Sequence, residues 1–291
     1  MIHDETPPEP APHVAPTPAP TEPNWLIEVR GLVMMLAAVI LFHSLVAKPF
    51  YIPSISMMPN LLVGDRLVVS KYPYGWSWVS ASFHILPRSQ VRLFPATPAY
   101  GDIVIVVPPA SDEDYIKRVV ALPGDRIAVV GGQIVLNGRR IPQVPQAPLL
   151  LPVDPNQPCD PDDFPGLRIR AADGRKYCEL PIFRETLPNG ATYRIIDHRD
   201  QPLDNYPETR VPEGHVFLMG DNRDHSADSR APVEEKGLGG PVPLSSVGGR
   251  AEFVTFSLDG SEGWNPVSWW KALRPDRSWT RLRPMMAHRG Q

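Results

Sequence analysis

The run Asp114–Asp125, DYIKRVVALPGD, sets the expectations for both the architecture and the chemistry of this 291-residue chain. Its β-branched and aromatic residues favour an extended strand, in which alternate side chains share one face. Lys117 therefore shares a face with Tyr115 and Val119, whereas Ile116 and Arg118 point to the other face. The run predicts a strand that carries either a buried general base or, in the plainer interpretation, a surface lysine.

Lys117 can act as a general base only if its pKa is lowered. A free lysine has a pKa of about 10.4, and a base that works near neutral pH needs roughly 7 to 8. That shift costs roughly 3 to 5 kcal/mol. Apolar neighbours on the strand remove water from the amine, which is the desolvation that such a shift requires.

A second segment, Pro53–Pro59 (PSISMMP), supplies two hydroxyl groups. Ser54 and Ser56 are two residues apart, and the prolines restrict the backbone to extended or turn conformations. Both hydroxyls can therefore face one way, so that one attacks a carbonyl while the other donates, with a backbone N–H, to the oxyanion. The alternative is a pair of turn serines without chemistry.

The third segment, Met219–Arg230 (MGDNRDHSADSR), directly follows the apolar strand candidate Val216–Leu218. So many polar groups after a buried strand indicate a hydrogen-bonded scaffold. In this order the three segments, within about residues 49 to 257, resemble the bacterial type I signal peptidases. These are membrane-anchored serine proteases with a Ser/Lys dyad, and they remove signal peptides from exported preproteins.

The resemblance implies a role for each matching residue. Ser56 is the expected nucleophile, Lys117 the expected general base, and Ser54 and Ser56 the expected oxyanion hole. It further implies cleavage after small-x-small (Ala-x-Ala-like) sites through an acyl-enzyme, without a cofactor or a metal. Seven residues match the family's two shallow apolar pockets for substrate side chains: Phe50, Ile52, Met57, Leu61, Tyr115, Ile116 and Ala227.

Three more residues match the wall that supports the family's dyad. Ser226 is expected to hydrogen-bond the lysine, and the charged pair Asp228 and Arg230 is expected to orient this wall. Two positions depart from the family pattern. Asn60 stands where the family often has threonine, and Ala231–Gly239 is longer and more polar than expected.

The same third segment has two other interpretations. His225 and Asp228 would complete a Ser/His/Asp triad with Ser56, although the motif match places Ser226 rather than His225 toward the lysine. A calcium loop would need glycine at position 6, where this sequence has Ser229, so we do not expect calcium. The oxygen ligands of that loop would be Asp224, Ser226, Asp228 and Glu235.

The membrane segment follows from hydropathy. Gly31–Ala47 is an uncharged run of 17 residues between Arg30 and Lys48, near the lower limit for a spanning helix. We expect a single-pass anchor over residues 26–48; the acidic residues before it and the large Leu45 disfavour a cleavable signal peptide. Because Arg30 and Lys48 place one positive charge at each end of the run, charge alone gives almost no preference for either orientation in the membrane. The resemblance places the N-terminus in the cytoplasm and the catalytic domain outside the bacterial inner membrane.

The rest of the chain predicts a mainly β, antiparallel fold. The expected strands are 66–70, 101–107, 125–130, 133–137, 192–196 and 215–219, with hairpin turns at Gly131–Gly132 and Asn137–Gly138. Residues 1–25 form a proline-rich tail that we expect to be disordered. The resemblance implies a catalytic β domain over 49–125 and 212–291, with a smaller β-rich domain, 126–211, inserted between them.

Charge and cysteine usage limit the partners. A net charge of -3 gives no reason to expect nucleic acid. The resemblance implies preproteins as partners, the apolar run predicts contact with the lipid bilayer, and we expect a monomer. Cys159 and Cys178 are predicted to form a disulfide, worth roughly 3 kcal/mol for a loop of about 20 residues, with two free thiols as the alternative. Two other functions stay open: an inactive membrane-tethered binding or assembly factor, and a self-processing Ser/Lys protease.

Overall fold

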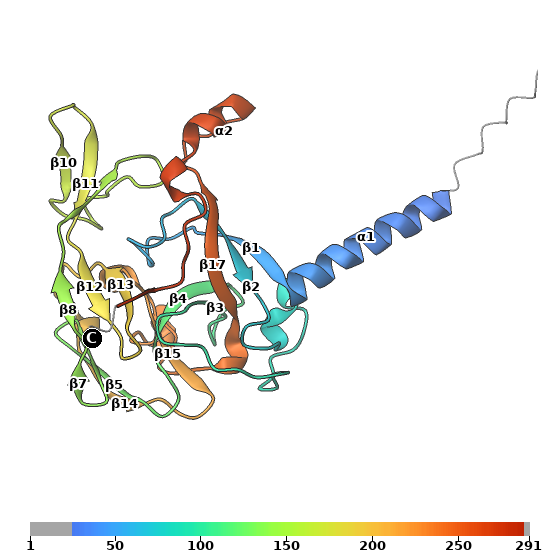
Figure 1. Ribbon diagram of the computed structural model, residues 1–291, viewed down its shortest axis with the longest axis horizontal. Helices are drawn as coiled ribbons and strands as arrows, with labels where there is room; N and C mark the ends of the chain where they lie inside the picture. The colour runs from blue at the N-terminus through green and yellow to red at the C-terminus, as the bar shows by residue number, and fades with distance from the viewer. Residues whose placement is uncertain (1–24, 288–291) are drawn as a thin grey trace, which may run out of the picture. The chain divides into compact units, whose positions relative to one another are not determined.

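The structure is a computed structural model, and it describes residues 25–287 (Figure 1). Residues from Ile40 onward form one compact unit, and the part of the chain before it is described by itself. The named strands of the unit's four sheets all pair antiparallel, which confirms the predicted mainly β fold class. Short 3-10 helices lie at Trp78–Ser80, Ser82–His84, Pro202–Asp204, Arg223–His225, Val233–Glu235, Leu244–Ser246 and Pro275–Arg277.

Helix α1 (Trp25–Leu45) contains all but the last two residues of the predicted apolar run Gly31–Ala47. Its 21 residues span about 32 Å, close to the thickness of the hydrocarbon core of a bilayer, and by length and composition it can cross a membrane. The helix ends three residues before the predicted limit of the anchor, because Ala47 and Lys48 already pair with Ser70 and Val69 in a sheet. Pro49 explains this end, since the residue before a proline disfavours the helical conformation.

The largest sheet has seven strands. Their order is β1 (Ala47–Tyr51), β2 (Asp65–Ser70), β17 (Val247–Ser257), β3 (Ile103–Val106), β4 (Tyr115–Ala121), β15 (His215–Met219) and β16 (Val242–Pro243). The eleven-residue β17 shifts register against both neighbours, and such bulges bend a strand and increase its twist. At Gly249 the backbone has φ +151, and a Cβ there would lie 2.4 Å from Ser70 O, so only glycine fits this bend.

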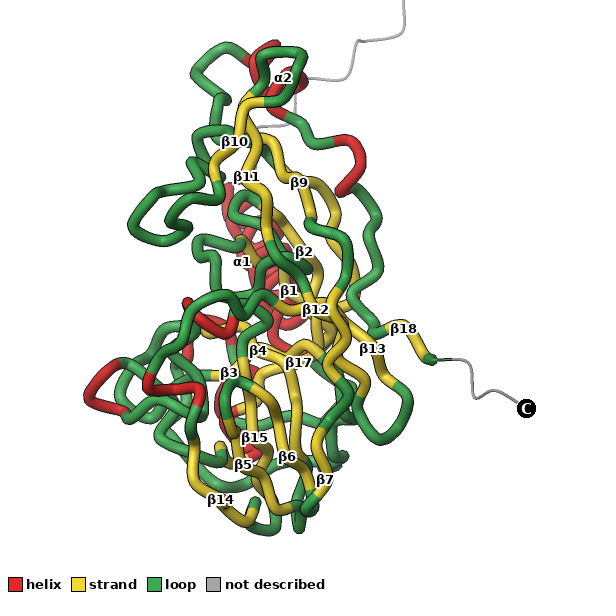
Figure 2. Tube along the Cα trace, turned by 90° about the vertical axis from the view of Figure 1, so that its left-hand side faces the viewer, coloured by secondary structure: helices red, strands yellow, loops and turns green. Residues whose placement is uncertain are grey.

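Three smaller sheets complete the unit. One has the order β14 (Tyr206–Arg210), β5 (Arg126–Val130), β6 (Gln133–Leu136) and β7 (Arg139–Arg140). The second has β18 (Met285–Met286), β13 (Ala191–Ile195), β12 (Phe183–Thr186) and β8 (Gln143–Pro145). The third has β10 (Arg168–Arg170), β11 (Lys176–Leu180) and β9 (Leu149–Pro152). Figure 2 shows β10 and β11 near one end of the unit and β7 and β14 near the other.

The six predicted strands are present with ends that differ by at most two residues, and both predicted hairpins form. Gly131 and Gly132 have φ of 56 and 76, and Asn137 and Gly138 have φ of 51 and 75, as tight turns between twisted strands require. Strands β4 and β15 share a buried core with β5, β6 and β13. The division into catalytic and inserted domains therefore stays a prediction, because one apolar core spans both.

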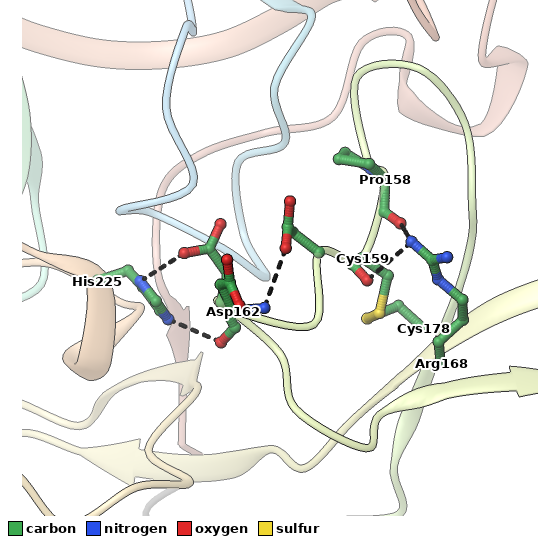
Figure 3. The surroundings of a disulfide bond; sticks show 8 residues. Pro158, Cys159, Asp162, Arg168, Cys178 and His225 are labelled. Atoms are coloured by element: carbon green, nitrogen blue, oxygen red, sulfur yellow. Dashed lines mark hydrogen bonds and ion pairs between the residues drawn. A yellow bond between two sulfur atoms is a disulfide. The ribbon is translucent and has the colours of Figure 1, made fainter.

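Two local features lie at the end of the unit near β10 and β11. Helix α2 (Pro266–Ala272) begins at Asn265, whose side chain accepts a hydrogen bond from Val267 N. Cys159 and Cys178 form a disulfide with their Cα atoms 5.6 Å apart, and this bond joins the loop after β9 to β11 (Figure 3).

Candidate active site

The loop that follows β1 carries Ser54 and Ser56. Met57 and Leu61, both fully buried, pack with Ile52 in the core of the large sheet and hold this loop from beneath. The backbone turns back on itself, since Met58 N donates to Ile55 O and Leu61 N donates to Met57 O. Met57 and Leu61, expected in the substrate pockets, thus lie in the core rather than among the residues that line the pocket.

Lys117 meets this loop from β4. Its Nζ atom lies 3.0 Å from Ser56 Oγ, and Ser54 Oγ lies 3.2 Å from the same oxygen. Only 4% of Lys117 is exposed, and its Nζ lies 5.6 Å from the ring centre of Tyr115. Burial lowers the pKa of Lys117 to about 8, and the nearby carboxylates of Asp228 and Asp221 limit the shift. The two segments that the sequence singled out are therefore in hydrogen-bond contact.

Asp228 and Arg230 form a buried pair in the wall beside the lysine. Asp228 accepts hydrogen bonds from Arg230 Nε and Nη2, each at 3.0 Å, and from Gly220 N at 2.9 Å. Burial alone would raise the pKa of Asp228. The Arg230 guanidinium and the backbone N–H groups of Gly220 and Arg230 outweigh this effect and hold the pKa below its usual range. The aspartate therefore stays ionised, and the pair fixes the segment that follows Gly220.

Ser226 packs against Gly220 at the same wall. A Cβ atom on Gly220 would lie 2.2 Å from Ser226 Oγ and 2.6 Å from Ser56 O, so the close approach requires glycine. Ser226 Oγ is buried and has no hydrogen-bond partner among the residues that the structure describes. The expected hydrogen bond from Ser226 to Lys117 is thus not formed here, although the residue lies beside the serine loop.

A polar cluster that was not expected from the sequence includes Arg118, on the face of β4 opposite Lys117, together with Asp221 and Asn60. Arg118 Nε and Nη2 donate to Asp221 at 2.7 and 2.6 Å, and Asn60 Nδ2 donates to Asp221 Oδ2 at 2.7 Å. The position of Arg118 could have indicated this cluster from the sequence, because a charged residue in a buried strand needs a partner of opposite charge. Asn222 N donates to Ser56 O at 3.1 Å, so the segment with Asp221 holds the serine loop directly.

Ser56 and Lys117 open into a pocket of about 390 Å³. Strands β1 and β4 both border it, although three strands separate them in the sheet, so the sheet curls around this site. Expected residues that line the pocket are Phe50, Ile52, Ser54, Ser56, Tyr115, Ile116, Lys117 and Ala227. Charged and polar residues at its edge are Glu113, Asp114, His225, Glu235 and Lys236.

The alternative interpretations find no support in this geometry. The His225 ring contacts Asp163 and Arg199, and in residues 25–287 no hydrogen bond joins it to Ser56 or Asp228. Burial also lowers the pKa of His225. Asp228 is occupied by Arg230, and the described residues include no group of three or more His, Cys, Asp or Glu side chains placed to hold a metal.

Comparisons with known proteins identify the family of this chain. The family model described as signal peptidase, peptidase S26, matches residues 25–256. Signal peptidase I of Rickettsia bellii is 32% identical over 254 residues, which cover 84% of this chain and 75% of that protein. The Rickettsia canadensis signal peptidase I is 32% identical over 84% of this chain and 82% of its own length.

A solved structure is also similar. The crystal structure of a signal peptidase I from Enterococcus faecalis matches with a TM-score of 0.28 and 19% identity, covering 53% of this chain and 95% of that one. The family match spans most of the chain and includes the serine loop, β4 and the Gly220–Arg230 wall. The chain belongs to the signal peptidase family, peptidase S26, and is a serine peptidase.

Proposed function

We propose that this protein is a membrane-anchored endopeptidase that cleaves N-terminal signal peptides from exported preproteins after small-x-small sites. Ser56 is the nucleophile and the neutral amine of Lys117 is the general base. The observation that carries the proposal is the 3.0 Å contact between Lys117 Nζ and Ser56 Oγ, made by a lysine that is almost wholly buried. The resemblance to signal peptidases over most of the chain supports the choice of substrate.

The reaction begins with proton transfer. The lone pair of Lys117 Nζ takes the proton of Ser56 as its Oγ attacks the scissile carbonyl carbon, and the carbonyl electrons move to its oxygen. Ser54 Oγ, beside Ser56 Oγ, and the Ser56 N–H donate hydrogen bonds to this oxyanion. The lysine ammonium then protonates the leaving amine of the mature protein. An acyl-enzyme ester remains, in which Ser56 Oγ carries the signal peptide.

Deacylation uses the same base. Lys117, again neutral, takes one proton from water while the hydroxide attacks the ester carbonyl, and it returns this proton to Ser56 Oγ as the C–O bond to the serine breaks. The signal peptide leaves as a carboxylic acid, which releases its own proton to solvent. With a pKa of about 8, roughly a tenth of the lysine is neutral at pH 7. An ordinary lysine would be neutral in less than about one molecule in a thousand at that pH. Burial of the amine therefore increases the neutral, active fraction of Lys117 about 200-fold at pH 7.

The pocket supports a preference for small side chains. Apolar walls from Ile52, Tyr115 and Ile116 leave a shallow space beside Ser56, and Ala227 adds no bulk. A large substrate residue would have to displace buried strand residues, which costs about 1 to 3 kcal/mol in a well-packed interior. We propose cleavage after Ala-x-Ala-like sequences on this ground and on the family resemblance.

Membrane attachment is part of the proposal. Helix α1 has the length and composition of a single membrane span. We propose that it is oriented with the N-terminus in the cytoplasm of a bacterium, as the resemblance to bacterial signal peptidases implies. The unit from Ile40 onward then works on the outer side of the inner membrane. Exported preproteins present their cleavage sites on that side while their signal peptides are still in the bilayer.

Cleavage of a purified preprotein by the full-length protein in detergent tests the proposal. Ser56→Ala and Lys117→Met are each expected to lower kcat by more than about 10³-fold while leaving the fold intact. Lys71→Met is the matched control. Lys71 is also buried, and its pKa is also lowered to about 8, by burial and by Lys48, but its Nζ lies 3.4 Å from Val79 O and 5.9 Å from the ring centre of Phe50, and among the described residues no hydrogen bond joins it to Ser56. Cleavage that survives Ser56→Ala and Lys117→Met would refute the assignment.

A further inference from the structure

His225 occupies the wall of the pocket without taking part in the proton transfers. It ends the 3-10 turn Arg223–His225, directly before Ser226 and Ala227. Its ring lines the same pocket as Ser56 and Lys117. A shift of His225 therefore moves the two residues that follow it, one packed on Gly220 beside the serine loop and the other lining the pocket.

Two polar contacts of the His225 ring come from a distant loop. Its Nε2 lies 3.0 Å from the carbonyl oxygen of Asp163, and its Nδ1 lies 3.6 Å from Asp163 Oδ1. Figure 3 marks polar contacts of the His225 ring with dashed lines. The ring of Phe164 packs against it with the centroids 5.5 Å apart. Arg199 contacts Nε2 and also donates to Asp162 O at 3.1 Å. The loop thus holds the ring from its hydrogen-bonding edge and from its side.

The disulfide fixes the start of this loop. Cys159 lies four residues before Asp163, and its partner Cys178 is in β11, between β9 and β10. Phe164 is 4% exposed and packs in the same apolar cluster as both cysteines. Phe164 N donates to Asp160 O at 2.6 Å, which closes the loop on itself. A continuous set of contacts therefore runs from the disulfide through Asp163 and Phe164 to His225.

We propose that the loop closed by Cys159–Cys178 positions the substrate pocket, and that His225 is the positioning residue through which it acts. The disulfide holds Asp163 and Phe164 in place, these hold the His225 ring, and the ring fixes the Ser226–Ala227 wall against which a preprotein binds. This inference rests on the proposed function, because it concerns substrate binding at the same pocket. It assigns to the disulfide a role in substrate affinity in addition to stability.

A double-mutant cycle on the full-length protein in detergent tests the proposal with a preprotein as substrate. Replacing both cysteines (Cys159→Ser with Cys178→Ser) and His225→Ala are each expected to raise KM by about tenfold, with kcat changed by less than about twofold. A displaced wall weakens substrate binding equally in the ground state and in the transition state, so KM rises while kcat stays nearly unchanged. Combining the changes is expected to raise KM no further, because both break one set of contacts.

Two further variants separate positioning from general stability. His225→Gln keeps a side-chain amide that can donate to Asp163 O, and it is expected to restore most of the affinity lost in His225→Ala. Asp163→Ala is expected to raise KM severalfold, whereas Asp162→Ala is the matched control and leaves KM unchanged. Asp162 is exposed, and Arg199 contacts it only through the backbone oxygen, which alanine retains.

Two results would overturn the inference. One is an unchanged KM in folded His225→Ala and in the folded cysteine variant, and the other is a combined effect equal to the product of the separate ones. If the cysteine variant does not fold, the cycle between Asp163→Ala and His225→Ala decides in the same way. If the wild type cleaves a preprotein and this cleavage depends on Ser56, either of the two results would refute the positioning role of His225 and leave the proposed function intact. Failure of the wild type to cleave any preprotein would refute the proposed function as well.

Discussion

Arg118 and Asp221 form a bidentate ion pair that is almost fully buried, with 3% and 1% of the two side chains exposed. The pair lies on the face of β4 opposite Lys117, and Asn60 adds a third hydrogen bond to the same carboxylate. Asp221 continues into Asn222, whose N–H holds the carbonyl of Ser56. The pair thus connects the strand of the expected base to the loop of the expected nucleophile.

Asp221→Asn is predicted to lower the free energy of unfolding by about 3 to 5 kcal/mol, because it leaves the guanidinium of Arg118 buried without a counter-charge. Urea denaturation measures the change. The matched control is Glu208→Gln in the exposed Arg126–Glu208 pair, where 65% and 44% of the side chains are exposed and the loss should stay below about 1 kcal/mol. Equal losses in the two variants would show that the buried pair has no special role.

Gly220→Ala is predicted to destabilise the protein by about 1 to 3 kcal/mol and to lower its activity, because the new methyl group would overlap Ser226 Oγ and Ser56 O. Thermal unfolding and preprotein cleavage, measured together, check both effects. Gly248→Ala is the control. A Cβ there meets its nearest neighbour, Val79 Cγ2, at an ordinary 3.6 Å, so stability should change by less than about 1 kcal/mol. A fully active Gly220→Ala protein would contradict the close packing at this wall.

Ser54→Ala is predicted to lower kcat by about 100- to 1,000-fold with little change in KM, because the hydroxyl stabilises charge that develops only in the transition state. Steady-state kinetics on a preprotein measure the effect. Ser54→Thr retains the hydroxyl and is expected to keep most of the activity. Equal kcat values for the alanine and threonine variants would remove Ser54 from the oxyanion hole.

Local patterns in the sequence predicted a large part of the fold. Runs of β-branched residues between turns identified β2, β3, β5, β6, β13 and β15, because alternation and turn chemistry are local properties. The short strands β7 to β12, in the proline-rich middle of the chain, carry no such pattern, and β17 has two glycines and three register shifts that interrupt it. Tertiary pairing determines these strands.

The candidate site was predictable only in part, for a related reason. Ser56 and Lys117 carry chemistry that their own segments reveal, whereas the partner of Arg118 is 103 residues away in the chain. The contact between Asp163 and His225 likewise joins residues 62 positions apart. No local spacing encodes such contacts, so residues that hold a site in place are harder to predict than those that react.

The pH dependence of kcat/KM tests the central claim, that the neutral amine of buried Lys117 is the base, most directly. Burial lowers the pKa of Lys117 from 10.5 to about 8, so the fraction of active base rises as pH increases through that value. The account predicts that kcat/KM increases about tenfold per pH unit below pH 8, levels off above it, and shows the same inflection in Lys71→Met. A flat profile, or an inflection near about 6.5 or below, where a histidine base titrates, would contradict it.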